Sequence, residues 1–282
     1  MTGIMSGTAR ALKIELFSAL RGRVIWLLLL LPVTISVLRL LLIKLSTLKQ
    51  LVQSGGDQAA ITGFGYLVDG MLAGLITLNI IFIAYSALNF ALDRDQGVLR
   101  HLVIRSVSRQ SIVAAKLLLM LVLATVAATL VIGVSMLVSA GLWELGPVVE
   151  DGYEIIGEEE IIPEIRVGLL LALLPLPVTI CLGLLISVAS RSAVRALVVA
   201  LAVGLGFDVL KGALGAAGNY LSLSFLPAIN DHSYLKDVAG IARGFSDILI
   251  DEKVYQLNIW LPLPQAIIIF ILAIVLVNRK TL

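Results

Sequence analysis

Charged residues are scarce in this sequence, and that scarcity argues against a soluble fold. Only 14% of the 282 residues are charged, whereas 59% are hydrophobic. Ordinary soluble domains carry about 25% charged residues. A soluble core in so short a chain cannot bury this much apolar surface, and no polar stretch is long enough to form a separate soluble domain. The composition therefore predicts an all-α integral membrane protein.

Cysteine and histidine are nearly absent. Cys181 is the one cysteine, and it lies inside an apolar run, so no internal disulfide forms and a packing role is expected. His101 and His232 are far apart, and no His/Cys cluster points to a metal site. More than twenty residues precede the first apolar run and no A-x-A site follows it, which argues against a cleavable signal peptide.

Several catalytic and binding patterns are missing from the sequence. It has no G-x-x-x-x-G-K-[ST] loop to hold nucleotide phosphates, no H-E-x-x-H zinc motif and no G-x-S-x-G elbow with a plausible base. Asp69 and Asp208 lie toward the outer ends of apolar runs, a poor fit to a membrane aspartyl protease. No basic-aromatic pattern indicates nucleic acid. We therefore expect no active site in this chain.

Six apolar runs are long enough to cross a bilayer as helices, since a span needs about 20 residues. They cover approximately residues 24–43, 66–92, 112–140, 167–188, 196–214 and 258–277. Before them, residues 8–21 show moderate helical amphipathicity, with Ala9, Leu12, Leu16, Ala19 and Leu20 on one side. Such a segment fits an interfacial helix at the membrane surface, or an ordinary basic leader.

The charges indicate an orientation. If the N-terminus is cytoplasmic, the inner segments 1–23, 93–116, 190–195 and 278–282 hold 13 Lys/Arg and 3 Asp/Glu, counted along the sequence. The rest of the chain holds 8 Lys/Arg and 16 Asp/Glu. Because Lys and Arg gather in cytoplasmic loops, both termini are expected on the cytoplasmic side of the cell membrane. The acidic segment 141–166 then lies outside, as a solvated loop or a cation-attracting vestibule, and residues 215–257 form an outer cap.

A few polar residues fall within the spans. Asp208 and Lys211 are three residues apart, so they share one face of a helix. Ionisable residues at membrane depth are candidates for a transport path, although both side chains can also reach the outer interface. Asn79 is a third candidate for the path, or a helix–helix hydrogen-bonding group. Pro175, Pro177, Pro262 and Pro264 predict kinks in the fourth and sixth spans.

The segment from Asp93 to Lys116 is the only long, markedly basic stretch between two apolar runs. Leu99, Leu102 and Val103 fall at helical spacing, which predicts a short amphipathic helix. Its sequence resembles the type-2 family of ATP-binding-cassette (ABC) exporter permeases. That family carries a pattern like E-x-G-T-L-x-x-L-x-x-x-P-V-S-R-x-x-I-x-x-x-K between its second and third spans. The matching positions here are Asp95, Gly97, Val98, Leu99, Leu102, Ser106, Val107, Ser108, Arg109, Ile112 and Lys116, with Asp95, Val98 and Ser106 departing from the pattern.

The resemblance implies that this segment is a coupling helix gripped by a separate ATPase. The residues it assigns to coupling are Asp95, Gly97, Leu99, Leu102, Ser108, Arg109 and Lys116. Ser108 is expected to cap the next helix, and Arg109 and Lys116 to anchor it at the lipid surface. ATP and Mg²⁺ would be bound by the ATPase subunit, with no cofactor in this chain. A second permease subunit, identical or related, would pair with it.

The whole chain, residues 1–282, is then a single transmembrane permease domain: 1–23 interfacial, 24–277 a six-span bundle and 278–282 a cytoplasmic tail. Two alternatives remain open at the level of the sequence. The chain could be an ATP-independent secondary transporter or channel, or a membrane scaffold that transports nothing. The transported substrate is not indicated.

Overall fold

The computed structural model describes residues 2–54, 63–98, 108–150, 153–228, 233–242 and 252–279. Within these ranges it is a bundle of helices with one small β-hairpin. The elements are α1 (Thr2–Arg21), α2 (Arg23–Ser54), α3 (Gly63–Asp95), α5 (Arg109–Leu142), β1 (Val148–Glu150), β2 (Tyr153–Ile156), α6 (Glu158–Leu173), α7 (Leu176–Ala189), α8 (Ala193–Leu214), the 3₁₀ helices η1 (Gly215–Tyr220) and η2 (Ser222–Phe225), α9 (Tyr234–Ile241), α10 (Glu252–Trp260) and α11 (Pro262–Arg279).

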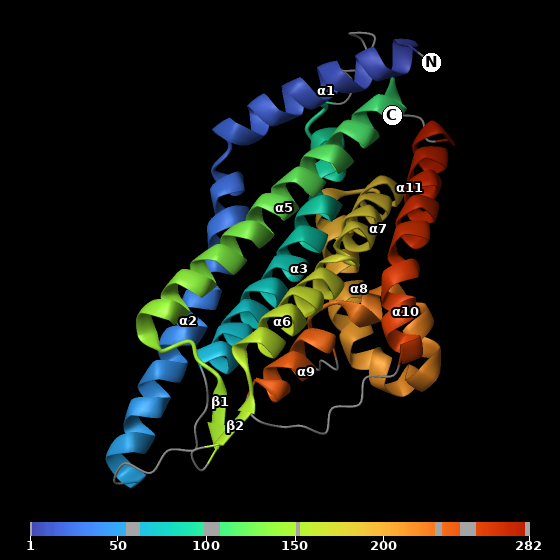
Figure 1. Cartoon of the computed structure of the whole chain (residues 1–282). Helices are drawn as coiled ribbons and strands as arrows, with labels where there is room; N and C mark the ends of the chain where they lie inside the picture. The colour runs from blue at the N-terminus through green and yellow to red at the C-terminus, as the bar shows by residue number, and fades with distance from the viewer. Residues whose placement is uncertain are drawn as a thin grey trace.

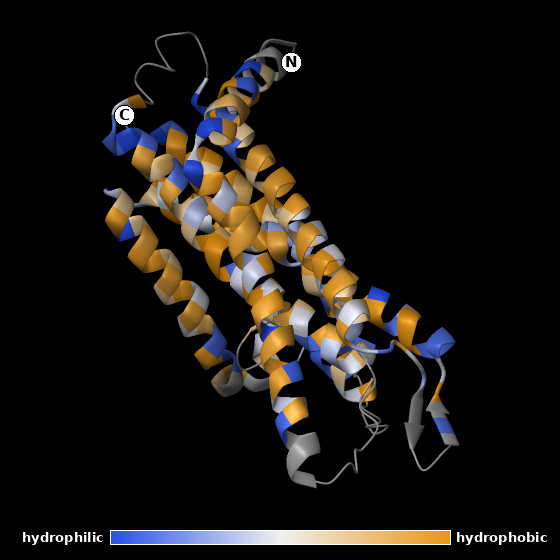
Figure 2. Cartoon of the chain, turned by 90° about the vertical axis from the view of Figure 1, so that its left-hand side faces the viewer, coloured by the Kyte–Doolittle hydropathy of each residue, from blue (hydrophilic) through white to orange (hydrophobic). Residues whose placement is uncertain are grey.

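The prediction of six spans is confirmed. Within the described residues, six helical segments are long and apolar enough to cross a membrane: Arg23–Lys49, Gly63–Asp95, Arg109–Leu142, Glu158–Ala189, Ala193–Lys211 and Glu252–Arg279. Figure 2 shows apolar residues along the middle of the bundle and polar residues toward its two ends. This distribution is the one expected for a bundle whose middle lies in hydrocarbon.

Helix α3 is the centre of the bundle. It packs against α2, α5, α7, α8 and α9. α1 and the C-terminal end of α11 lie at one end of the bundle, hereafter the termini end, and β1–β2 lies at the other, the hairpin end (Figure 1). An even number of spans produces this arrangement, as the sequence predicts.

Helix α1 crosses the termini end and packs mainly on α5. Ala11 is buried, and Leu12 and Ala19 pack against the bundle core. Leu16 and Leu20, from the same expected apolar side, are exposed instead. An interfacial position for α1 in the membrane stays a prediction.

Helices α3 and α7 approach closely because of a glycine. A Cβ placed on Gly183 would lie 1.9 Å from Ser86 Oγ and 2.8 Å from the carbonyl oxygen of Ile83. No larger residue fits here unless the helices separate. One turn further along, the amide of Ala91 donates to Ser187 Oγ over 2.9 Å, which fixes the two helices in register.

The fourth span is broken at proline, as the sequence predicts. α6 ends at Leu173 and α7 begins at Leu176, with Pro175 between them. In a continuous helix the amide of residue 175 would bond to the carbonyl of Leu171, but proline has no N–H. Asn258 Nδ2 donates to that carbonyl over 3.2 Å, so a side chain from α10 replaces the missing donor.

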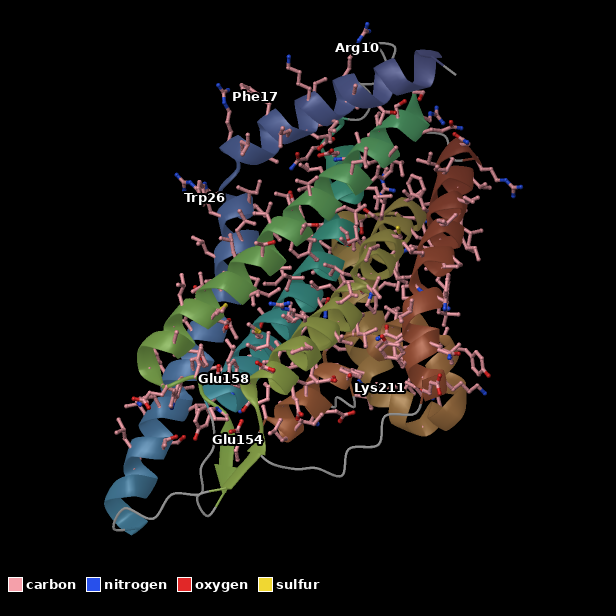
Figure 3. The ribbon with its side chains drawn as sticks, viewed as in Figure 1. Arg10, Phe17, Trp26, Glu154, Glu158 and Lys211 are labelled. Atoms are coloured by element: carbon pink, nitrogen blue, oxygen red, sulfur yellow. The ribbon has the colours of Figure 1, made fainter. Side chains whose placement is uncertain are left out.

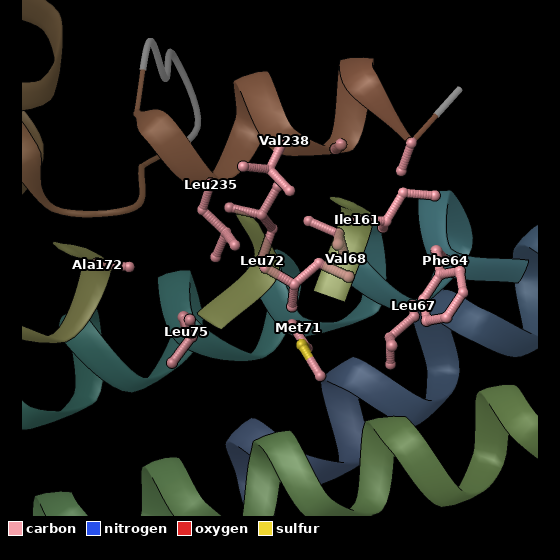
Figure 4. Packing of buried hydrophobic residues seen from close by; sticks show 13 residues of the cluster. Phe64, Leu67, Val68, Met71, Leu72, Leu75, Ile161, Ala172, Leu235 and Val238 are labelled. Atoms are coloured by element: carbon pink, nitrogen blue, oxygen red, sulfur yellow. The ribbon is translucent and has the colours of Figure 1, made fainter. Parts of the chain in front are cut away.

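The hairpin end differs from the expected solvated loop. α6 begins at Glu158 instead of near residue 167, and Glu158, Glu159 and Glu160 occupy its first turn, where carboxylates stabilise the helix dipole. α9 lies over α3 and α6, and its Leu235 and Val238 are fully buried against them (Figure 4).

The hydroxyl of Tyr234 in α9 donates a hydrogen bond to Glu164 of α6. Burial, together with this hydrogen bond, raises the pKa of Tyr234. The hydroxyl therefore remains the donor, and Glu164 joins two helices rather than standing free in a vestibule.

Candidate functional site

The coupling segment is described only at its two ends. Residues 99–107, including Leu99 and Leu102, lie outside the described residues, and so does most of the short helix expected there. The flanks of this loop are the end of α3 and the start of α5.

At the α3 flank, Asp95 binds the beginning of another span. Its Oδ2 accepts a hydrogen bond from the amide of Ala193 over 2.7 Å, at the N-terminus of α8. Arg94 Nη1 donates to the carbonyl of Ser190 over 2.6 Å. Because free amides and a positive dipole end meet the carboxylate there, Asp95 acts as a tie between α3 and the α7–α8 turn.

Two more of the proposed coupling residues shape the ends of the loop. Gly97 has a φ of +75°, a conformation that favours glycine, and its amide bonds to the carbonyl of Arg94 over 3.0 Å. Ser108 caps α5, because its Oγ accepts from the amide of Ser111 over 3.2 Å. The prediction of this cap is confirmed. Arg109, the first residue of α5, is half-buried.

Lys116 lies inside the bundle, and the prediction that it anchors α5 at the lipid surface is wrong. Its side chain is fully buried. Its ammonium pairs with Glu15 of α1 over 2.9 Å and with Asp93 of α3, and donates to Asn89 Oδ1 over 2.8 Å. Two carboxylates and an amide oxygen satisfy the charge, so it need not reach the head groups.

These contacts form two polar groups that adjoin along the backbone of residues 93–95 at the termini end, and together we call them the loop-base network. Its members are Glu15, Asn89, Asp93, Arg94, Asp95, Lys116, Ser190 and Ala193. Through it, the two flanks of one loop contact α1, α3, α5 and the α7–α8 turn. The two flanks of the loop are therefore bonded to four parts of the bundle.

The expected transport-path residues meet elsewhere. Asn79 of α3 and Asp208 and Lys211 of α8 line one cavity of about 60 Å³ between α3, α7 and α8. Asp208 Oδ1 and Lys211 Nζ are 3.2 Å apart, so the pair on one helical face is confirmed. Asn79 Nδ2 donates to the carbonyl of Pro227 over 3.4 Å. Figure 3 shows Lys211 toward the hairpin end, near the level of Glu158.

Thr179 of α7 lines the same cavity, and the sequence analysis missed it. It is 2% exposed, and its hydroxyl has no hydrogen-bond partner among the described residues. The other threonines of the described spans donate to the carbonyl four residues earlier: Thr34, Thr47, Thr77, Thr125 and Thr129. A missing partner cannot be read from a sequence, so no signal marked Thr179.

The described residues hold no group of three or more His, Cys, Asp or Glu side chains able to bind a metal ion. The two polar sites are therefore an ion-pair network at one end of the bundle and a small cavity near the other.

A family model described as "ABC-2 family transporter protein" matches residues 10–277 of this chain. The chain belongs to the ABC-2 transporter family. Comparison with curated proteins and with solved structures finds no match. Membership and the six apolar helices together make the chain a transport permease, an all-α, multi-pass membrane protein.

Proposed function

We propose that this permease is the membrane subunit of an ATP-driven exporter and that residues 93–116 couple it to separate ATPase subunits. The ATPase would bind ATP and Mg²⁺, and this chain would form the translocation path. The observation that carries the proposal is the loop-base network. Asp95 and Lys116, at the two ends of the segment, hold it to α8, α3 and α1.

The network explains how a push on a short loop could move whole helices. ATP binding would close the ATPase subunits against the loop. Because its flanks are bonded to several helices, the force would act on them together and bias the bundle between two states. A loop joined only through its own backbone would transmit little of this force.

A second permease subunit, identical or related, would complete the path. Three spans present wide apolar faces. In the apolar stretches of α2, α8 and α10–α11, 28%, 17% and 17% of the residues are buried, against 61% in α3. Such faces suit lipid and a neighbouring subunit. We place both termini in the cytoplasm, on the Lys/Arg distribution, and treat residues 1–282 as one transmembrane domain.

Leu102→Asp tests the coupling role, with Leu102→Met as an apolar control of similar volume. The parent permease and both variants are purified in mild detergent from their native cells, and soluble partners are identified by mass spectrometry. We expect a stoichiometric ATPase with the parent and with Leu102→Met, and a loss of at least about tenfold with Leu102→Asp, since a buried charge at the contact costs more than 1.4 kcal/mol.

If Leu102→Asp retains the ATPase and its stimulation, the loop is not the coupling site. If the parent permease purifies alone in several detergents, the ATP-independent transporter becomes the better account.

A further inference from the structure

We propose that the cavity between α3, α7 and α8 binds the compact zwitterionic head group of an amphiphile, with the cationic part at Asp208 and the anionic part at Lys211. The tail would lie along the outer face of α8. Binding itself does not require an ATPase; a role in export rests on the function proposed above.

The charged residues of the cavity wall favour a ligand that carries one positive and one negative charge. Asp208 and Lys211 are the only charged residues among those described in the wall, and they are paired over 3.2 Å. A lone cation or anion supplies an opposite charge to only one member of this pair. A zwitterion instead supplies an opposite charge to each member at once.

Two further polar groups can complete the binding of such a head. Thr179 is almost completely buried, lines the cavity and has an unpartnered hydroxyl among the described contacts. Every other threonine of the described spans uses its hydroxyl on its own helix. A buried hydroxyl without a partner is costly, so a ligand atom that meets it would be favoured. Asn79, on the opposite wall, adds an amide.

Size and access separate the head of the ligand from its tail. About 60 Å³ holds a head of a few non-hydrogen atoms and no long chain. Leu205 lines the cavity and is also 45% exposed on α8, so the cavity reaches the outer surface of that helix. Val209 and Leu210, further along α8, are 71% and 57% exposed. An alkyl tail leaving the cavity there would contact apolar side chains.

The test uses three probes with a saturated twelve-carbon chain: N-dodecylglycine (zwitterionic), dodecylamine (cationic) and dodecanoate (anionic). Equilibrium binding to the full-length permease, purified in a non-ionic detergent without any ATPase, is measured for each. We expect N-dodecylglycine to bind about tenfold more tightly than either single-charge probe, the effect of one retained charge–charge contact.

Single neutralisations should change the preference in opposite directions. Asp208→Asn leaves Lys211 and should favour dodecanoate, whereas Lys211→Met leaves Asp208 and should favour dodecylamine. A misfolded variant loses binding to all three probes and cannot reverse a preference. The exchanged pair Asp208→Lys with Lys211→Asp keeps a neutral wall and should retain the preference for N-dodecylglycine, which covers the case in which a single variant fails to fold.

Thr179→Val should weaken N-dodecylglycine binding about tenfold or more, the effect of one hydrogen bond to a charged group. Thr125→Val, on a membrane-facing turn of α5, is the matched control and should not. The proposal is overturned if the parent and both neutralised variants rank the three probes in the same order. It is also overturned if Thr179→Val and Thr125→Val behave alike.

The source of the head group is decided by adding the ATPase partner. Stimulation of ATP hydrolysis by N-dodecylglycine identifies an exported amphiphile, and binding without stimulation identifies a resident bilayer lipid. A permease that recruits no ATPase but still shows the reversed preferences contradicts the exporter assignment and leaves the binding site intact.

Discussion

At the scale of single residues, Lys116 is the clearest case of a charge whose role depends on its partners. Its ammonium is fully buried, yet it contacts two carboxylates and an amide oxygen. A buried ion pair adds little net stability compared with apolar residues, but removing one partner is costly because the other is left unpaired.

Lys116→Met should therefore destabilise the permease by about 3 kcal/mol, the lower end for a broken buried pair because Glu15 and Asp93 keep some solvent contact. The variant with all three charges removed, Glu15→Gln, Asp93→Asn and Lys116→Met, should recover most of the loss. Thermal unfolding in detergent measures both. Lys13→Met, an exposed lysine on α1, is the control; an equal loss in Lys13→Met and Lys116→Met would contradict the buried network.

The residues of the cavity could be predicted in part. Asp208, Lys211 and Asn79 were identifiable because ionisable and amide groups are rare in apolar helices. Their meeting in one cavity was not, because α3 and α8 are distant in sequence. The partners of Lys116 were equally hidden: Asp93 is in the same segment, but Glu15 lies three helices earlier.

At the scale of elements, the break in the fourth span is stabilised by a hydrogen bond from another helix, α10. Pro175 removes the donor for the carbonyl of Leu171, and Asn258 of α10 supplies another. α10 and α11 are themselves separated at Leu261. Two interrupted spans, the fourth and the sixth, are thus joined by one side-chain hydrogen bond.

Asn258→Leu should lower stability by about 1–3 kcal/mol, since it leaves a buried carbonyl unpaired. In a Pro175→Ala background the loss should be smaller, because residue 175 regains an N–H that can reach Leu171. A double-mutant cycle on thermal unfolding measures this coupling. Gln256→Leu, an exposed position on α10, serves as control. Additive effects of Asn258→Leu and Pro175→Ala would argue against the shared carbonyl.

The elements themselves were largely readable from the sequence. Long apolar runs give the six spans, Pro175 gives the break, and Ser108 gives the start of α5. The sequence analysis placed the start of α6 too late because the first turn of α6 is acidic. A run of acidic residues is typical of a solvated loop, but carboxylates are also favourable in the first turn of a helix. The docking of α9 depends on tertiary contacts to α3 and α6, which no local pattern encodes.

At the scale of the whole molecule, the two ends of the bundle differ in charge, and this difference predicts its orientation. Arg10 and Glu154 lie at opposite ends (Figure 3). Both are exposed. The only cysteine, Cys181, is buried, so the parent chain is a low-background host for new cysteines.

Glu154→Cys should react with a membrane-impermeant maleimide in intact cells, because the proposed orientation places the hairpin end outside the cell. Arg10→Cys should react only after the membrane is permeabilised, and the parent chain should stay unlabelled in both conditions. Labelling is read as a mass shift on gels. The reverse pattern would invert the orientation and place the loop-base network on the wrong side for a cytoplasmic ATPase.

The contact between Glu15 and Lys116 also sets an order for biosynthesis. α1 is made before α5, but the cation that neutralises Glu15 lies on α5, the third span. While α2 and α3 are being inserted, the carboxylate of Glu15 lacks the cation with which it pairs in the folded chain. The contact with Lys116 becomes available only when the ribosome has delivered the third span, so α1 completes its native contacts later than its place in the sequence suggests.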